Sequence, residues 1–205
     1  MNKYINQLNV NNKTEFLKQL YQIGQMNDVP IIGDDSLMTV LSLMKAKDAK
    51  NILEIGTATG FSGISMLMSA PNAHLYTIEH NESRVKTARD NFTKAGLIDR
   101  VSFFVGDVHE IINFVTGEFD FLFFDGPKSH YLEFVKKLRP YLAPNAVLVC
   151  DNVLFRGTVS GENGYERRMR TIVNNMHEFL EYMTEGEWDT SVYDIGDGVS
   201  ISILK

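Results

Sequence analysis

The sequence contains 205 residues, of which 44% are hydrophobic, and it carries a formal net charge of −6. A chain of this length and apolar content can bury the core of one α/β domain, which excludes intrinsic disorder, and its acidic balance argues against indiscriminate nucleic-acid binding. A single cysteine excludes an internal disulfide framework and fits a reducing compartment. The N-terminus is polar and does not resemble a signal peptide, and no apolar run reaches membrane-spanning length. The chain is therefore predicted to be cytoplasmic, without a membrane partner.

Residues 1–48 are predicted to form an N-terminal helical segment. Thr14 is expected to cap a first helix, whose spacing places one apolar face at Phe16, Leu17, Leu20 and Ile23. Asp34 or Asp35 is expected to cap a second helix that ends near Lys47.

Residues 51–60 predict a buried strand, a turn rich in small residues and the start of a helix. Gly56 and Gly60 bracket the turn, where backbone N–H groups can approach a ligand at the end of the strand. The turn lacks the second glycine of the dinucleotide fingerprint and the lysine of a P-loop. Glu54, in the strand end, would repel a pyrophosphate but suits a ligand with an amino group, such as S-adenosylmethionine. The alternative is a turn that only packs a helix on a strand.

Strands and helices alternate through the rest of the chain. Further strands are expected near residues 74–79, 101–105, 119–125, 146–150, 188–193 and 199–204, and the longer helices near 81–95, 129–139 and 165–182. This alternation predicts a mostly parallel sheet with helices on both faces. The short connection containing Asp-Gly before the last strand predicts a C-terminal antiparallel hairpin. Cys150, inside an apolar run, is expected to be buried rather than nucleophilic.

Four predicted strand ends carry a carboxylate, at Glu79, Asp107, Asp125 and Asp151. Ligands of parallel sheets bind outside the carboxyl ends of the strands, so we expect these groups to converge on one site. Glu79 can accept hydrogen bonds from both hydroxyls of a ribose, and Asp107 with Val108 can contact an adenine ring. The alternative is a set of solvated loop residues.

Asp125, Asp151 and Asn152 form a second group at neighbouring strand ends. Two carboxylates and an amide oxygen are ligands that Mg²⁺ prefers, and such an ion lowers the pKa of a bound hydroxyl. Lys128 can accept the proton or stabilise the oxyanion, although an exposed loop lysine is the alternative. His130 is expected to be a surface residue at a helix start.

These motifs resemble a known family. Residues 54–62, Glu79, residues 124–128 and residues 151–153 together are similar to the catechol O-methyltransferase-like family of metal-dependent O-methyltransferases. The resemblance covers roughly residues 30–205. It implies a single domain over residues 1–205, with a class I, Rossmann-like core from residue 49 and a seven-stranded sheet.

The resemblance also assigns roles to individual residues. The residues implied to hold S-adenosylmethionine are Ile32, Glu54, Gly56, Ser62, Glu79, Asp107, Val108 and Asp125. Those implied to hold Mg²⁺ are Asp125, Asp151 and Asn152. Lys128 and Asp125 are the implied catalytic residues, with Lys128 as the base.

Within that family the chain looks most like the bacterial tRNA 5-hydroxyuridine methyltransferases, which make 5-methoxyuridine at the wobble position. The feature behind this is a basic segment in which Arg167, Arg168 and Arg170 can contact tRNA phosphates. A solvated helix face is the alternative. The resemblance also implies a homodimer.

Three other functions compete with this one. The same chemistry on a small catechol-like phenol is the nearest alternative, because both acceptors can chelate a metal. A different class is a non-catalytic protein that binds S-adenosylmethionine or RNA, against which the intact set of Asp125, Asp151, Asn152 and Lys128 argues. A nicotinamide-dependent dehydrogenase is least favoured, given the glycine pattern and the terminal hairpin.

Overall fold

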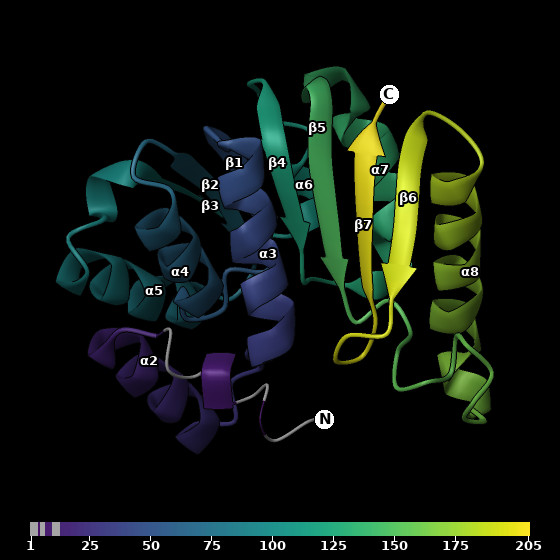
Figure 1. Cartoon of the computed structure of the whole chain (residues 1–205), viewed down its shortest axis with the longest axis horizontal. Helices are drawn as coiled ribbons and strands as arrows, with labels where there is room; N and C mark the ends of the chain where they lie inside the picture. Colours follow the sequence, from purple (N-terminus) through teal and green to yellow (C-terminus); the bar gives the residue numbers. More distant parts are fainter. Residues whose placement is uncertain (1–3, 5–6, 10–12) are drawn as a thin grey trace.

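A seven-stranded sheet forms the centre of the molecule (Figure 1). The computed structural model describes residue 4, residues 7–9 and residues 13–205; parts of the predicted N-terminal segment, residues 1–3, 5–6 and 10–12, lie outside the described residues. The strands are β1 (Asn51–Ile55), β2 (His74–Glu79), β3 (Val101–Val105), β4 (Phe119–Phe124), β5 (Leu142–Asp151), β6 (Trp188–Tyr193) and β7 (Val199–Leu204). Their order is β3-β2-β1-β4-β5-β7-β6.

The strand directions confirm the predicted mixed sheet. Strands β1 to β5 pair in parallel, whereas β7 runs antiparallel to both β5 and β6. Because β1 lies between β2 and β4, the chain leaves β1 toward one half of the sheet and later returns to build the other half. The carboxyl ends of β1 and β4 therefore flank the switch point, where open α/β sheets form a ligand crevice.

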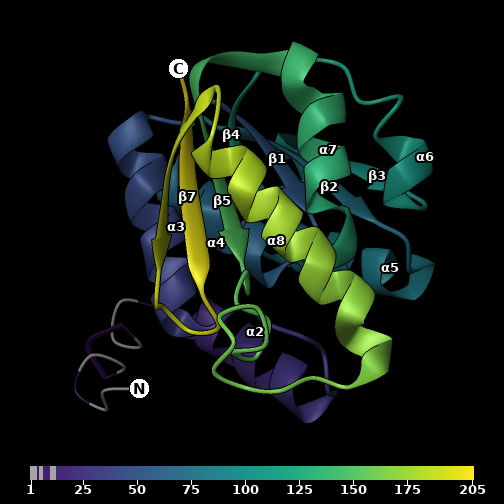
Figure 2. The same cartoon turned by 90° about the vertical axis from the view of Figure 1, so that its right-hand side faces the viewer.

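Helices cover both faces of the sheet, as predicted. One face carries α2 (Glu15–Met26), α3 (Asp34–Lys47), α4 (Phe61–Ser69) and α5 (Glu82–Lys94); the other carries α6 (Val108–Ile111), α7 (Tyr131–Leu138) and α8 (Arg170–Thr184). Figure 2 shows α3 on one side of the sheet and α7 with α8 on the other. Side chains alternate along β1, so that Leu53 and Ile55 enter one core and Ile52 the other.

The helix starts agree with the sequence in two cases and differ in one. Thr14 and Asn81 accept hydrogen bonds from the first turns of α2 and α5, as their positions predict. Neither Asp34 nor Asp35 caps α3; both lie inside its first turn, and Gly33 is the N-cap residue. The reason is tertiary, because Asp34 pairs with Lys13, and Asp35 accepts a hydrogen bond from the Asn9 side chain.

Three other details differ from the sequence prediction. Ile23 is exposed, because α2 packs through Leu17, Leu20 and Gly24 instead. Strand β5 begins at Leu142, four residues earlier than predicted. Short 3-10 turns, η2 (Lys128–His130) and η4 (Arg167–Met169), precede α7 and α8, and the two others are η1 (Ile98–Arg100) and η3 (Arg139–Tyr141). Cys150 is fully buried, which confirms its expected place in the core.

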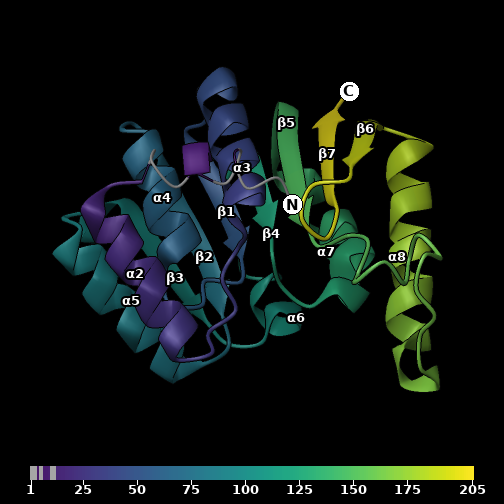
Figure 3. The same cartoon turned by 60° about the horizontal axis from the view of Figure 1, so that its bottom comes forward.

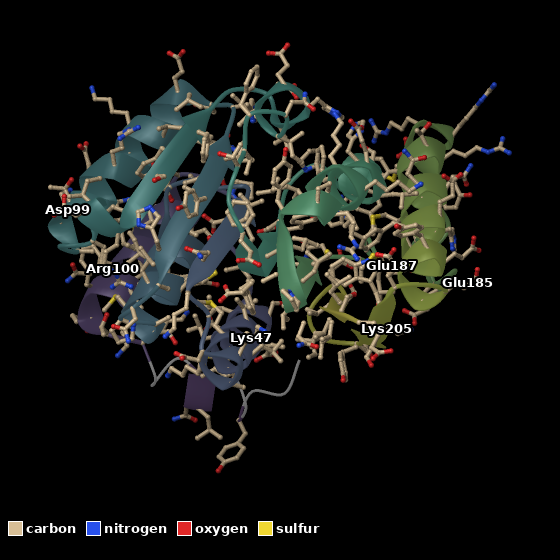
Figure 4. The ribbon with its side chains drawn as sticks, turned by 90° about the horizontal axis from the view of Figure 1, so that it is seen from above. Lys47, Asp99, Arg100, Glu185, Glu187 and Lys205 are labelled. Carbon is tan, nitrogen blue, oxygen red and sulfur yellow. The ribbon has the colours of Figure 1, made fainter. Side chains whose placement is uncertain are left out.

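The two edges of the parallel strands differ in character. Figure 3 brings forward the edge where these strands end, and Figure 4 looks onto the edge where they begin. At the edge where the strands begin, Arg100, which is labelled in Figure 4, donates hydrogen bonds to the carbonyl oxygens of Leu67, Ala70 and Ala73. These bonds hold the end of α4. Within the described part of the chain, no helix is long and apolar enough to cross a membrane.

Candidate active site

A cavity of about 440 Å³ opens at the edge where the parallel strands end. Its wall comes from the segments that follow β1, β2, β3 and β4, which places it at the switch point of the sheet. Three of the predicted carboxylates, Glu79, Asp107 and Asp125, line it. The parallel strands thus bring together acidic residues that are up to 46 positions apart in the sequence.

The glycine turn after β1 is shaped by the neighbouring strand. Gly56 has a φ of +105°, and a Cβ atom on it would lie 2.5 Å from the carbonyl oxygen of Asp125. The Asp125 N–H donates to the carbonyl oxygen of Ile55 at 2.9 Å, so β1 and β4 stay close beyond their last residues. Only glycine combines this φ with this approach. Gly56 therefore sets the spacing between the first turn and Asp125.

Glu79 is held firmly at the end of β2. One carboxylate oxygen accepts the Ala58 N–H at 3.0 Å, and the other accepts the Asn81 N–H at 3.0 Å. His80 Nδ1 lies 3.0 Å from the second oxygen. Each oxygen keeps further acceptor capacity, and the residue lines the cavity. The glycine turn thus orients Glu79 toward any ligand with paired hydroxyls.

Glu54 has a different place. Its side chain is fully buried, and its two oxygens accept hydrogen bonds from Ser62 Oγ at 2.5 Å and Thr77 Oγ1 at 2.6 Å. Burial raises its pKa to about 7, against the opposing effect of these two bonds. The carboxyl group lies behind the turn rather than in the cavity wall, and it ties α4 to β2.

The other predicted cofactor residues divide between two hollows. Gly56 and Val108 line the main cavity with the three carboxylates, and one oxygen of Asp107 also accepts the His109 N–H at the start of α6. Ile32 and Ser62 line a small adjoining hollow, which Gly56 and Asp125 also border.

Asp125 directly follows β4, and Asp151 is the last residue of the neighbouring strand β5. Asp151 is buried, with 2% of its surface exposed, and Ser36 Oγ in α3 donates to it at 3.0 Å. Burial, followed by the charge of Asp125, raises the pKa of Asp151 to about 6. Burial also raises the pKa of Asp125, opposed by Lys128, whose Nζ lies 3.4 Å from Asp125 Oδ1. The pair is therefore an electrostatically costly arrangement that a cation would relieve.

The loop after β5 is fixed by the hairpin loop. The N–H groups of Val153 and Leu154 donate to the carbonyl oxygens of Gly198 and Asp197, both at 3.0 Å. Asn152, directly before them, has a φ of +57°, a left-handed conformation that asparagine tolerates better than most residues. The C-terminal hairpin thus orients the third residue of the predicted metal group.

The site contains two histidines that were not expected there from the sequence. His130, expected at the surface, and His109 both line the cavity, with ring centroids 4.1 Å apart. Glu133 lies beside both rings, and its pKa is lowered to about 2, first by the hydrogen bond from Lys137 and then by His109. The signal for His109 was its position two residues after Asp107. Ser36 contacts a residue 115 positions away, so no local pattern could have indicated its role.

The three arginines lie outside the cavity. Arg167 and Arg168 belong to η4, Arg170 begins α8, and all three are exposed. Arg168 Nε pairs with Glu166 at 2.9 Å. The first turn of α8, a helix described over its full length, contains no acidic residue. This leaves the positive end of the helix dipole and the arginines together at the surface.

Comparisons with known proteins agree with this geometry. A family model described as O-methyltransferase matches residues 6–204. Among curated proteins, the tapetum-specific methyltransferase 1 of Arabidopsis thaliana is 26% identical over 199 residues, covering 91% of this chain and 85% of that protein. A catechol O-methyltransferase of Niastella koreensis is 35% identical over 123 residues, covering 58% and 56%.

Solved structures share the whole fold. A Staphylococcus aureus protein assigned as a caffeoyl-CoA O-methyltransferase has a TM-score of 0.91 and 28% identity, and the match covers 99% of this chain and 98% of that one. An O-methyltransferase from Bacillus cereus, solved with S-adenosylhomocysteine (SAH), has a TM-score of 0.85 and 22% identity over 98% and 97% of the two chains. The latter likeness shows the fold alone.

Proposed function

The chain belongs to the O-methyltransferase family, and from this premise we propose that it transfers a methyl group from S-adenosylmethionine to a metal-chelating hydroxyl. The observation that carries the proposal is the meeting of two groups at one sheet edge. The cavity beside Glu79 and Asp107 is shared with Asp125, which is also next to Asp151 and Lys128. A cofactor site thus adjoins a site for a cation and an acceptor.

The cavity supports a cofactor of this size and chemistry. Its volume of about 440 Å³ falls in the range of small-molecule sites. We assign the ribose hydroxyls to Glu79, the adenine ring to Asp107 and Val108, and the methionine end to the turn at Gly56 and to Asp125. Ile32 and Ser62 would border the methionine end from the adjoining hollow, and Glu54 would act by holding Ser62 and the turn in place.

The residues Asp125, Asp151 and Asn152 fit Mg²⁺. Burial, followed by the charge of Asp125, raises the pKa of Asp151 to about 6, which is the perturbation expected where carboxylates are gathered to hold a cation. All three side chains offer hard oxygen ligands, and Ser36 keeps one oxygen of Asp151 in place. When bound, Mg²⁺ supplies a Lewis acid that lowers the pKa of the acceptor hydroxyl. Lys128, positioned beside Asp125, would accept the proton of that hydroxyl when its amine is neutral, or stabilise the oxyanion when it is charged.

We propose 5-hydroxyuridine at the tRNA wobble position as the acceptor. Its hydroxyl neighbours a carbonyl, so it can chelate a metal in the manner of a catechol. The exposed arginines at Arg167, Arg168 and Arg170 support an RNA substrate, because α8 packs on η2, the segment that carries Lys128. Asn175 of α8 donates to the carbonyl oxygen of Ser129 at 2.7 Å, which joins the two elements. In this arrangement, tRNA backbone phosphates would contact the arginines while the wobble base enters the site.

A small catechol-like phenol is the second candidate, favoured by the catechol O-methyltransferases among the relatives. Methyl transfer to tRNA from a strain that lacks the enzyme, compared with transfer to a panel of catechols, separates the two. Chelation of Mg²⁺ should stop either reaction; turnover that persists without divalent ions would contradict the metal assignment. The homodimer stays a prediction, which sedimentation would contradict by finding only monomer.

The arginine assignment has its own test. Replacing Arg167, Arg168 and Arg170 together with alanine should weaken tRNA binding and reduce the slope of log K against log salt by about 0.7–0.9 for each lost phosphate contact. A control with the same charge change replaces three exposed lysines on the other face, Lys45, Lys86 and Lys94. If the slope is unchanged in the arginine variant, or falls equally in the control, the small-phenol function takes the lead.

A further inference from the structure

A cluster of metal-ligating side chains lies beside the cavity, and two of its three members, His109 and His130, line it. His109 of α6, His130 of η2 and Glu133 of α7 each offer one donor atom, and these three atoms lie within 4.8 Å of one another. His109 Nδ1 is 3.1 Å from Glu133 Oε1, and His130 Nδ1 is 3.5 Å from Glu133 Oε2. The fold therefore brings His109 to His130 and Glu133, which are three residues apart where η2 continues into α7, so that nitrogen and oxygen donors lie within reach of one ion.

The spacing suits a four-coordinate ion. Ligands about 2.1 Å from a tetrahedral metal ion are about 3.4 Å apart. Each imidazole Nδ1 lies near that distance from one Glu133 oxygen, His109 at 3.1 Å from Oε1 and His130 at 3.5 Å from Oε2, so the carboxylate faces both rings. The rings are held in place by packing: they meet edge to face at 4.1 Å, and Phe134 contacts both. The three side chains therefore already lie together, and the contact that an ion must replace is the one between Lys137 and Glu133.

The donor chemistry differs from that of the Asp125 group. Two imidazoles and one carboxylate suit Zn²⁺ and related transition metals, whereas Mg²⁺ prefers oxygen ligands alone. The side chains of His109, His130 and Glu133 are 35%, 38% and 39% exposed, so an ion can enter from solvent. Both histidines line the main cavity, which leaves room there for a water molecule as the fourth ligand.

We propose that His109, His130 and Glu133 form a second metal site, selective for transition-metal ions of the Zn²⁺ class, in the wall of the cofactor cavity. Lys137 competes with the ion in the metal-free protein, because its Nζ lies 2.9 Å from Glu133 Oε1. It also reaches toward the carbonyl oxygen of His109 at 3.4 Å. Binding an ion therefore displaces Lys137, and removing that ammonium group should strengthen the site.

The test is Zn²⁺ binding by calorimetry and the visible spectrum of bound Co²⁺, both in excess Mg²⁺ and in an Asp151→Asn background that disables the other site. Co²⁺ bound by imidazole in four-coordinate geometry absorbs strongly, whereas an oxygen-only site gives a weak spectrum. We expect one ion per chain in the parent background. Binding should weaken about 10-fold or more in His130→Ala and Glu133→Gln, and tighten in Lys137→Met.

His177→Ala is the matched control, because His177 is an exposed histidine on α8 that lines neither the main cavity nor the hollow beside His130 and Glu133. Its affinity for Zn²⁺ should equal that of the parent. Because His130 lines the cofactor cavity, the far-UV circular dichroism spectrum and the unfolding midpoint of every variant, rather than SAH binding, verify the fold. No binding in the parent background, or equal affinity in the parent, His130→Ala and Lys137→Met, would overturn the proposal. His109, His130 and Glu133 would then be a hydrogen-bonded group at the edge of the cavity that binds no metal ion.

Discussion

Replacing Asp151 with asparagine should stabilise the protein in the absence of metal ions. The same change should abolish methyl transfer when Mg²⁺ is present. In the fold, Asp151 is 2% exposed and faces the charge of Asp125. Its pKa rises from 3.8 to about 6, so the folded chain binds this proton more tightly than the unfolded chain. The stability that comes from the group is present below pH 3.8 and is lost as the pH rises through about 6.

The magnitude follows from the same values. A rise from 3.8 to about 6 corresponds to about 3 kcal/mol of unfolding free energy at a pH above both. Asparagine removes the charge but keeps an oxygen for Ser36, the donor at 3.0 Å. We expect Asp151→Asn to gain about 1–3 kcal/mol at pH 8 in a chelator, and about half of that gain at pH 5.

Urea unfolding at the two pH values, with and without Mg²⁺, measures this effect. Mg²⁺ should stabilise the parent and leave the variant nearly unchanged, while SAH affinity stays within a few-fold and methyl transfer is lost. Asp90→Asn, at an exposed position of α5, is the control and should change nothing. A variant that is less stable than the parent at pH 8 without metal would refute the electrostatic reasoning and make Asp151 a structural residue.

Three further predictions concern other parts of the fold. Glu79→Ala should weaken SAH binding by about 2–4 kcal/mol, because it removes both acceptors for the ribose hydroxyls; unchanged affinity by calorimetry would place the cofactor elsewhere. Gly56→Ala should cost about 2–4 kcal/mol of stability in urea unfolding, since its Cβ would lie 2.5 Å from the Asp125 carbonyl oxygen at a φ of +105°; a cost no larger than that of Gly33→Ala, where the added Cβ meets nothing within 4 Å, would contradict the close approach. Arg100→Ala, at the edge shown in Figure 4, should lower the free energy of unfolding by about 1–3 kcal/mol without affecting SAH binding, because its hydrogen bonds hold the end of α4 and the segment before β2 at the edge opposite the cavity; a change in SAH affinity would show that the two edges are coupled.

The sequence by itself determined the order and type of the elements and the position of the carboxylates. Strand and helix periods are local properties, so the parallel sheet and the terminal hairpin could be predicted from short windows. Parallel strands end at one edge, and this rule alone brings Glu79, Asp107 and Asp125 to one cavity. The turn at Gly56 could also be predicted from the sequence. The reason that glycine is required there, the close approach of the Asp125 carbonyl oxygen, could not.

Only the tertiary structure decided which side chains complete the site. Ser36 meets Asp151, and His109 meets Glu133, through helices whose packing no short window of sequence encodes. Asp34 lies in the first turn of α3 instead of at its cap, and its side chain pairs with Lys13, 21 positions away. Such contacts depend on how whole elements dock, since their partners are chosen by the three-dimensional packing of the core and not by the local hydrophobic period.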